Sequence, residues 1–410
     1  MFASPKSERP ETIPGGPQYR KRTDPGKIGF IPQLESIRGI GALMVAALHA
    51  GQSHTTSHLT LVSDPRSWTN PLWSALFSVY RLVSNGRGAL IVFFVLSGFV
   101  LASSIERGPH GVGPAARHFF IGRVFRLYPA IIFAVLLFSL AYWLTGAFLP
   151  GATTHSFSLT SIVRNMLLID TNIDGVMWSL QVEALAIPLI FAVTIGRRGF
   201  GEKFVVVMMA LFFALSWWPA YQDLLRGRLV LLYTFIFGIA THSIGPHLIQ
   251  RIGRGGVPWL VAATLVLFFM PRAVLGVASK WAPLCECLSA VGMIAVIVYG
   301  GKSTLAQILN WPLFRFYGRI SYSFYLLHPL TLLVIWTIPA MLSGLIDAGV
   351  AAVVVAISLT ILSTLVITPL AWLSWRFIEI PGIATGRRLS PDRRNASPYV
   401  SPRGQVVHVP

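Results

Sequence analysis

The sequence predicts an all-α fold: a polytopic membrane helix bundle with about ten transmembrane helices and both termini in the cytoplasm. Composition is the first reason, because 54% of the 410 residues are apolar and only 12% are charged. A soluble domain usually carries about twice that share of charge and could not cover so many apolar side chains. The second reason is the mean hydropathy of +0.65, and the third is the placement of the positive charges.

A transmembrane helix needs roughly 20 consecutive apolar residues, and scanning for such segments gives ten of them. The first is the least apolar, because it carries Arg38 and His49, and the fifth is short. Residues 71–84 are too short to span a bilayer and fit an interfacial or re-entrant helix. The expected spans are residues 34–53, 88–106, 124–146, 175–195, 203–219, 228–246, 257–276, 283–300, 320–342 and 349–376.

The positive charges support this topology. About three quarters of the Lys and Arg residues lie at span ends that face the cytoplasm when both termini are inside, as the positive-inside rule requires. Membrane topology therefore explains the net charge of +18, and we expect membrane lipids rather than nucleic acid around this protein. We expect a polar N-terminal tail over residues 1–33, a transmembrane domain over 34–380 and a basic, disordered C-terminal tail over 381–410.

Ionisable side chains inside apolar spans are costly and mark candidate functional sites. In the first span, Arg38 and His49 lie on one helix face and are separated by about 16 Å along the axis. If Arg38 sits at the cytoplasmic interface, His49 lies near mid-membrane. The pair would then suit a long substrate with an anionic head and a reactive tip. Snorkelling of Arg38 and simple packing of His49 are the alternative interpretation.

The third and fourth spans carry further candidates. Arg123 and Arg126 are three residues apart, so they share a helix face and could bind a phosphate group in bidentate fashion. Snorkelling to the interface is again the simpler interpretation. Glu183 follows Trp178 and Ser179 in the stretch W-S-L-Q-V-E. A carboxylate within an apolar segment needs a basic partner or a proton.

The last two expected spans carry the remaining candidate residues. Tyr322 and His328 occur in S-Y-S-F-Y-L-L-H, where the tyrosine is an ordinary interfacial residue and the histidine is less easily explained. Arg376 and Glu379 are three residues apart, which favours a local salt bridge. His54 and His58 have the spacing of two metal ligands on a helix but lack a third ligand, so we expect no metal site.

In this order the motifs resemble those of the acyltransferase 3 family, integral membrane enzymes that acylate carbohydrates and other cell-surface molecules. The resemblance runs from Leu34 to Pro381. The matching stretches are L-E-S-I-R-G at 34–39 with His49, F-F-V-L-S-G-F at 93–99, R-V-F-R at 123–126, W-S-L-Q-V-E at 178–183, S-Y-S-F-Y-L-L-H at 321–328 and E-I-P at 379–381.

The resemblance implies an O-acyltransferase of a bacterial plasma membrane that moves an acyl group from acyl-CoA, most often acetyl-CoA, to a glycan or a lipid-linked sugar. We expect no tightly bound cofactor. His49 is the expected catalytic residue, with Arg38 and Glu35 beside it, and Arg123 and Arg126 would bind the donor. The expected supporting residues are Trp178, Ser179, Glu183, Tyr322, His328 and Glu379.

Three alternatives remain open at the level of sequence. His49 could act as a general base or form a covalent acyl-histidine. Glu35 or Glu183 could orient His49, or either could balance the arginines. Finally, a polytopic chain with intramembrane Arg, His and Glu residues could be a secondary transporter or an acyl-group translocator.

Overall fold

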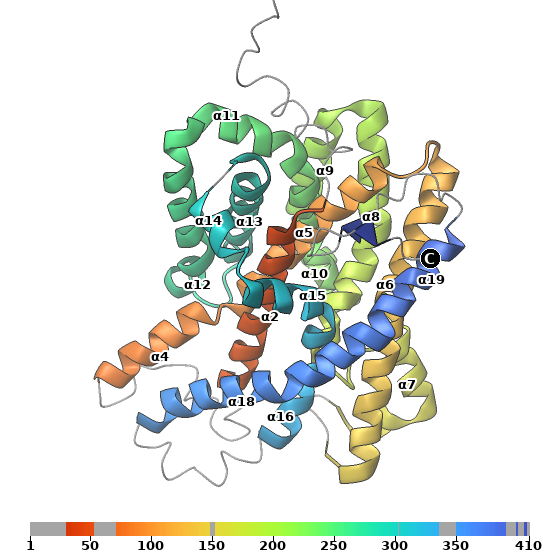
Figure 1. Cartoon of the computed structure of the whole chain (residues 1–410), viewed down its shortest axis with the longest axis vertical. Helices are drawn as coiled ribbons and strands as arrows, with labels where there is room; N and C mark the ends of the chain where they lie inside the picture. Colours follow the sequence, from red (N-terminus) through yellow and green to blue (C-terminus); the bar gives the residue numbers. More distant parts are fainter. Residues whose placement is uncertain are drawn as a thin grey trace, which may run out of the picture.

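Figure 1 shows a computed structural model of the chain, which describes residues 30–52, 71–147, 152–301, 303–335, 350–390, 399–400 and 406–407. His54 and His58 lie outside the described residues. The described part is helical apart from one short antiparallel pairing, in which β1 (Tyr399–Val400) pairs with β2 (Val406–Val407). The predicted all-α membrane bundle is confirmed to this extent.

The helices follow one another along most of the chain. Those of the first half are α2 (Pro32–Gln52), α4 (Pro71–Val83), α5 (Gly86–Glu106), α6 (Val112–Thr145), η3 (Thr154–Phe157), α7 (Leu159–Met166), η4 (Gly175–Met177), α8 (Trp178–Phe200) and α9 (Glu202–Leu215). Those of the second half are α10 (Pro219–Asp223), η5 (Leu224–Leu231), α11 (Leu232–Phe269), α12 (Pro271–Val274), α13 (Ala282–Tyr299), α14 (Thr304–Ile308), α15 (Pro312–Leu327), α16 (Pro329–Ile335), α18 (Val350–Ser374), η6 (Trp375–Glu379) and α19 (Ile380–Leu389).

Within the described residues, six helical segments are long and apolar enough to cross a membrane, so the expected count of ten is not confirmed. The two spans expected at 228–246 and 257–276 both fall in α11, whose two helical parts meet at a kink at Gly253, where φ is 62° and ψ is −177°. Helix α9 has 14 residues, about 21 Å at 1.5 Å per residue, which is shorter than the hydrocarbon core. Helix α2 carries Glu35, Arg38 and His49 and is not among the six.

Two further helix boundaries differ from those expected from the sequence. The ninth span, expected over 320–342, is broken at Pro329, where α15 gives way to α16. The last helix does not stop near residue 380, because η6 and α19 extend it to Leu389. The short segment over 71–84 forms α4, which ends before Asn85, and the Asn85 side chain caps α5 by accepting a hydrogen bond from the Gly88 amide at 2.9 Å.

Helix α2 lies in the middle of the bundle and packs against α5, α15 and α18 (Figure 1). Its contact with α15 is made by glycines from both helices. A methyl group added at Gly318 would lie 2.6 Å from the Glu35 carbonyl oxygen, and one added at Gly39 would clash with the Gly318 amide. No side chain fits between the two backbones, so the helices approach as closely as glycine permits. This contact places Arg38 beside α15.

Candidate active site

A cavity of about 650 Å³, including the open space at its mouth, lies where five helices converge. Helix α2 contributes one residue, and α5, α6, α8 and α15 contribute the rest. The lining residues are Arg38, Leu90, Phe93, Phe94, Ser97, Arg123, Arg126, Leu127, Ser179, Leu180, Glu183, Ser321, Tyr322 and Tyr325.

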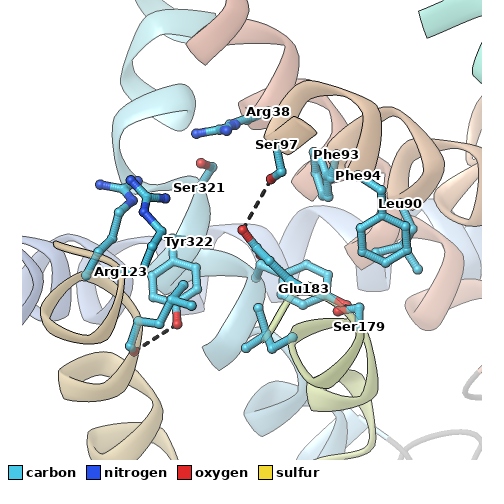
Figure 2. Close-up of a pocket in the computed structure, with 14 residues that line it drawn as sticks. Arg38, Leu90, Phe93, Phe94, Ser97, Arg123, Ser179, Glu183, Ser321 and Tyr322 are labelled. Carbon is cyan, nitrogen blue, oxygen red and sulfur yellow. Dashed lines mark hydrogen bonds between the residues drawn. The ribbon is translucent and has the colours of Figure 1, made fainter. Parts of the chain in front are cut away.

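The cavity has a cationic side and an apolar side. Figure 2 shows Arg38 and Arg123 apart from the group formed by Leu90, Phe93 and Phe94, with Glu183 between them. Six candidates from the sequence, which come from four different helices, thus meet in one place: Arg38, Arg123, Arg126, Ser179, Glu183 and Tyr322.

The arginines of the cavity are only partly neutralised. Arg126 lies 3.6 Å from the Glu379 carboxylate. Among the described residues, Arg38 and Arg123 have no ion pair and no hydrogen bond. The three guanidinium groups are nevertheless close enough to act on one another electrostatically. Unpaired charges of the same sign in a partly enclosed space are costly, so the arrangement favours an anionic ligand.

The carboxylates around the arginines have separate roles. Glu183 lines the cavity and accepts a hydrogen bond from the Ser97 hydroxyl at 3.2 Å. Glu35 does not line the cavity but lies within electrostatic reach of Arg38 and Arg126. Among the described contacts neither carboxylate binds His49. Of the two roles considered for them, the geometry therefore supports balancing the arginines and not orienting the histidine.

The ion pair predicted between Arg376 and Glu379 is wrong. The expected local salt bridge of Glu379 with Arg376 is replaced by the pairing with Arg126 and by a 3.2 Å hydrogen bond from the Ser323 hydroxyl. The reason is that residues Trp375–Glu379 form a π-helix, which has i→i+5 hydrogen bonds and rotates its residues away from α-helical positions. Glu379 is consequently buried, whereas Arg376 is exposed.

His49 lies in the last turn of α2, far along the helix from Arg38. Its Nδ1 is 2.9 Å from Nε2 of His328, and the two ring planes are inclined by only 4°. His49 does not line the cavity. A small cluster of buried apolar side chains shares Leu90, Phe93 and Tyr325 with the apolar side of the cavity. Its buried members are Val45, Ala89, Val176 and Tyr325, and Met44, Leu90 and Phe93 pack against them.

Tyr325 connects this apolar side of the cavity to the histidine pair. Its ring lines the cavity and packs edge-on against Phe93 at 6.3 Å, and its hydroxyl lies 2.7 Å from the Ser179 hydroxyl. The Tyr325 backbone carbonyl lies 2.7 Å from Nδ1 of His328. We name Phe93 and Tyr325 the aromatic layer, because both rings line the cavity and Tyr325 also contacts His328 through its backbone carbonyl.

The remaining candidates support the site from outside or from its wall. The Tyr322 hydroxyl donates a hydrogen bond to the Leu127 carbonyl at 2.9 Å and so joins α15 to α6. Trp178 does not line the cavity; the Arg228 guanidinium lies 5.3 Å from the centre of its ring. Within the described part of the chain, no group of three His, Cys, Asp or Glu side chains could hold a metal ion.

The sequence reasoning missed one buried charged pair. Glu286, which is fully buried, forms two 2.7 Å hydrogen bonds with Arg272. Asn85 adds a hydrogen bond to Glu286 at 3.3 Å. Glu286 lies between Cys285 and Cys287, which are both free thiols, in an otherwise apolar segment. A carboxylate inside such a run is itself a signal of a buried partner, and Arg272 stands at the start of the preceding short helix.

The fold and the cavity define an integral membrane protein with an arginine-lined cavity between its helices. Comparison with known families shows which one: the family model described as an acyltransferase domain matches residues 31–374, most of the chain. The protein belongs to the acyltransferase 3 family and is a membrane acyltransferase, as predicted. No curated protein and no solved structure matches the chain. The transporter interpretation is not favoured.

Proposed function

We propose that this protein transfers an acyl group, most often acetyl, from acyl-CoA to a hydroxyl group of a glycan or lipid-linked sugar. The observation that carries the proposal is the pair of unpaired guanidinium groups, Arg38 and Arg123, on one side of a cavity whose other side is apolar. Acyl-CoA has the same two-part character, because its head carries phosphate groups and its pantetheine arm ends in a neutral thioester.

The cationic side fits the phosphates of the donor. The guanidinium fork of arginine matches a phosphate in bidentate geometry better than an ammonium group does. Arg38 and Arg123 are free to make such contacts, and Arg126 can contribute while it remains near Glu379 at 3.6 Å. Glu183 accepts a hydrogen bond from Ser97 and lies within electrostatic reach of Arg38 and Arg123, so it offsets part of their repulsion and leaves their hydrogen-bond donors unoccupied.

In the proposal, the donor reaches the reaction centre at His49 along the apolar side of the cavity. In the proposed reaction the pantetheine arm lies against Phe93 and Phe94, and the thioester passes the aromatic layer before it reaches His49. As a neutral imidazole, His49 removes the proton from the acceptor hydroxyl while its oxygen attacks the thioester carbonyl. The C–S bond then breaks, and the CoA sulfur takes up the proton from His49.

The acceptor and the location belong to the same proposal. Arg38 and His49 lie toward opposite ends of α2, about 16 Å apart along the axis, so the donor head and the reacting hydroxyl would be held at different depths. This separation supports a donor that enters from the cytoplasm and an acceptor met deeper in, or beyond, the bilayer. We place the protein in a bacterial plasma membrane with both termini inside.

A single assay tests the function. Purified protein in lipid nanodiscs is incubated with radiolabelled acetyl-CoA and extracted membrane glycolipids. Label in the glycan fraction supports the proposal. Uptake of a solute into proteoliposomes without CoA, together with no labelled glycan, would support a transporter instead.

The matched variants are His49→Ala and His247→Ala. Loss of a general base costs about 10²–10⁴-fold in rate, so His49→Ala should be almost inactive. His247 is exposed and, among the described residues, bonds only the Ser243 carbonyl in the same helix, so its variant should retain the rate of the unmodified protein. A His49→Ala protein with more than about a tenth of that rate would exclude His49 as the base.

A further inference from the structure

The contact between His49 and His328 has the geometry of an in-plane hydrogen bond. The Nδ1 of His49 and the Nε2 of His328 are 2.9 Å apart, and the rings are inclined by 4° with centroids 5.2 Å apart. A centroid separation of that size is near the largest that two imidazoles joined by such a contact can have. The rings therefore lie end to end rather than face to face. In this arrangement an N–H of one ring points at the in-plane lone pair of the other.

The surroundings of His328 decide which nitrogen carries the hydrogen. Its Nδ1 lies 2.7 Å from the Tyr325 carbonyl oxygen, and a carbonyl oxygen can only accept, so Nδ1 must donate. A neutral imidazole has one N–H, and Nε2 of His328 is therefore an acceptor. It follows that Nδ1 of His49 donates to it and that Nε2 of His49 keeps its lone pair free. Among the described residues, His49 Nε2 has no hydrogen-bond partner.

His328 is held firmly enough to determine which nitrogen of His49 carries the hydrogen. It is 1% exposed and follows the last residue of α15, directly before the proline that starts α16. Its backbone N–H donates to the Phe324 carbonyl at 2.9 Å, and its carbonyl accepts from the Thr331 hydroxyl at 2.7 Å. The Thr331 hydroxyl in turn contacts Ser363 of α18. The imidazole ring therefore has little freedom to rotate away from Tyr325.

We infer that His328 is the positioning residue of His49: it fixes the His49 tautomer so that Nε2, and not Nδ1, faces the reaction as the base. This inference rests on the proposed acyl transfer for its consequence, though not for its geometry. When His49 takes the acceptor proton on Nε2, its Nδ1–H continues to donate to the neutral His328, which stabilises the imidazolium. The proton then leaves from Nε2 to the CoA sulfur, and His328 ends the cycle unchanged.

The tautomer can be measured without any substrate. In protein labelled with ¹⁵N-histidine, the His49 signals are identified by their absence from the His49→Gln variant. We expect His49 to carry its hydrogen on Nδ1, whereas a free imidazole prefers Nε2. A hydrogen on Nε2 of His49 in the unmodified protein would overturn the inference, whatever the outcome of the glycan-labelling assay. Failure of that assay alone would overturn only the acyl-transfer proposal.

Two substitutions separate positioning from packing. An asparagine amide can replace the donor at Nδ1, and a glutamine carbonyl can replace the acceptor at Nε2. His328→Asn should therefore keep the contact to Tyr325 but leave His49 free to change tautomer, whereas His328→Gln should keep an acceptor for His49. Loss of tautomer control in a catalytic histidine costs up to about 10⁴-fold in rate. We expect kcat to fall at least about 100-fold in His328→Asn and clearly less in His328→Gln, with the KM for acyl-CoA unchanged in both.

The control is His242→Gln. His242 is 2% exposed and also bonds a backbone carbonyl, that of Phe99 at 3.0 Å, but its partners include no second histidine. Its variant should keep kcat and the His49 signals. Equal kcat values for His328→Asn and the unmodified protein would overturn the positioning role. If His328→Asn does not fold, the His49 spectrum of the unmodified protein and the His328→Gln rate decide the question.

Discussion

Two buried charged centres in this protein are built in opposite ways. Arg272 and Glu286 form a closed pair, with both oxygens of the carboxylate bonded at 2.7 Å and an asparagine added at 3.3 Å. The centre at the cavity instead gathers three guanidinium groups, of which only Arg126 forms an ion pair among the described residues, with Glu379 at 3.6 Å. The closed pair uses its hydrogen-bonding capacity within the fold, whereas the unbonded guanidinium groups of Arg38 and Arg123 leave their donors open to a ligand. Burial alone does not distinguish the two centres, but the count of partners does.

The largest effect should come from breaking the closed pair. Glu286→Ala leaves the Arg272 charge without its partner in a mostly buried position, and removal of one member of such a pair costs about 3–5 kcal/mol. We expect that loss in the free energy of unfolding, measured by denaturant titration in mixed micelles. The double change Arg272→Met with Glu286→Leu should recover most of it. A loss below about 1 kcal/mol for Glu286→Ala would remove the contrast between the centres.

Arg126 shares a property with each centre, because it forms an ion pair with Glu379 and also lines the cavity. Arg126→Ala leaves Glu379, which is 2% exposed, with only its Ser323 hydrogen bond. We expect a loss of about 1–2 kcal/mol in stability, discounted because the Arg126 side chain is 32% exposed, together with weaker donor binding. Adding Glu379→Gln should restore stability but not the KM for acyl-CoA. Recovery of both quantities would show that Arg126 serves only Glu379.

Arg123 should affect binding without affecting the fold. Its guanidinium has no ion pair or hydrogen bond among the described residues, so Arg123→Ala removes repulsion and no native contact. A charge-assisted hydrogen bond is worth about 1.5–3 kcal/mol, so KM for acyl-CoA should rise roughly 10- to 100-fold. The thermal midpoint should stay level or rise. Arg123→Lys should rescue only in part, because a point charge lacks the bidentate fork; full rescue would contradict phosphate recognition by the fork.

The smallest effect is expected at an ion pair in water. Arg164 and Asp170 are 2.6 Å apart, outside the membrane-crossing helices, with 49% and 30% exposed side chains. The hydrogen bond from Arg164 lowers the pKa of Asp170, so any stabilisation is present above the unfolded carboxyl pKa of about 3.9 and disappears as pH falls through the folded value. Thermal midpoints of Asp170→Asn and the unmodified protein should agree at neutral pH. A clear difference there would mean that exposed pairs also stabilise this fold.

The sequence predicted the members of the cavity better than their partners. Arg38, Arg123 and Glu183 were singled out because charged groups are costly inside apolar spans, and the structure brings all three to one cavity. Pairings between helices leave no periodic trace. The contact of His49 with His328 joins residues 279 positions apart, so helical spacing within either segment could not indicate it.

The fold was predictable to the level of helices in a membrane, and less so in their limits. Apolar runs identify helical segments but not the bends between them: the two runs in α11 are separated by Gly253, whose backbone is not helical. The π-helix at Trp375–Glu379 shows the same limit on a smaller scale. It depends on how the backbone packs in three dimensions, so the pairing of Glu379 across to α6 could not be obtained from its neighbours in sequence.

The glycine contact between α2 and α15 gives the two helices a common reference point. Arg38 and His49 belong to α2, and Tyr322 and His328 belong to α15 or directly follow it. The position of α2 against α15 within the cavity wall and the 2.9 Å histidine contact therefore depend on the same pair of backbones. A side chain introduced at Gly39 or Gly318 would separate both pairs of residues at once. In the proposed reaction, a change in the spacing of these two helices would therefore alter both donor recognition and the alignment of His49.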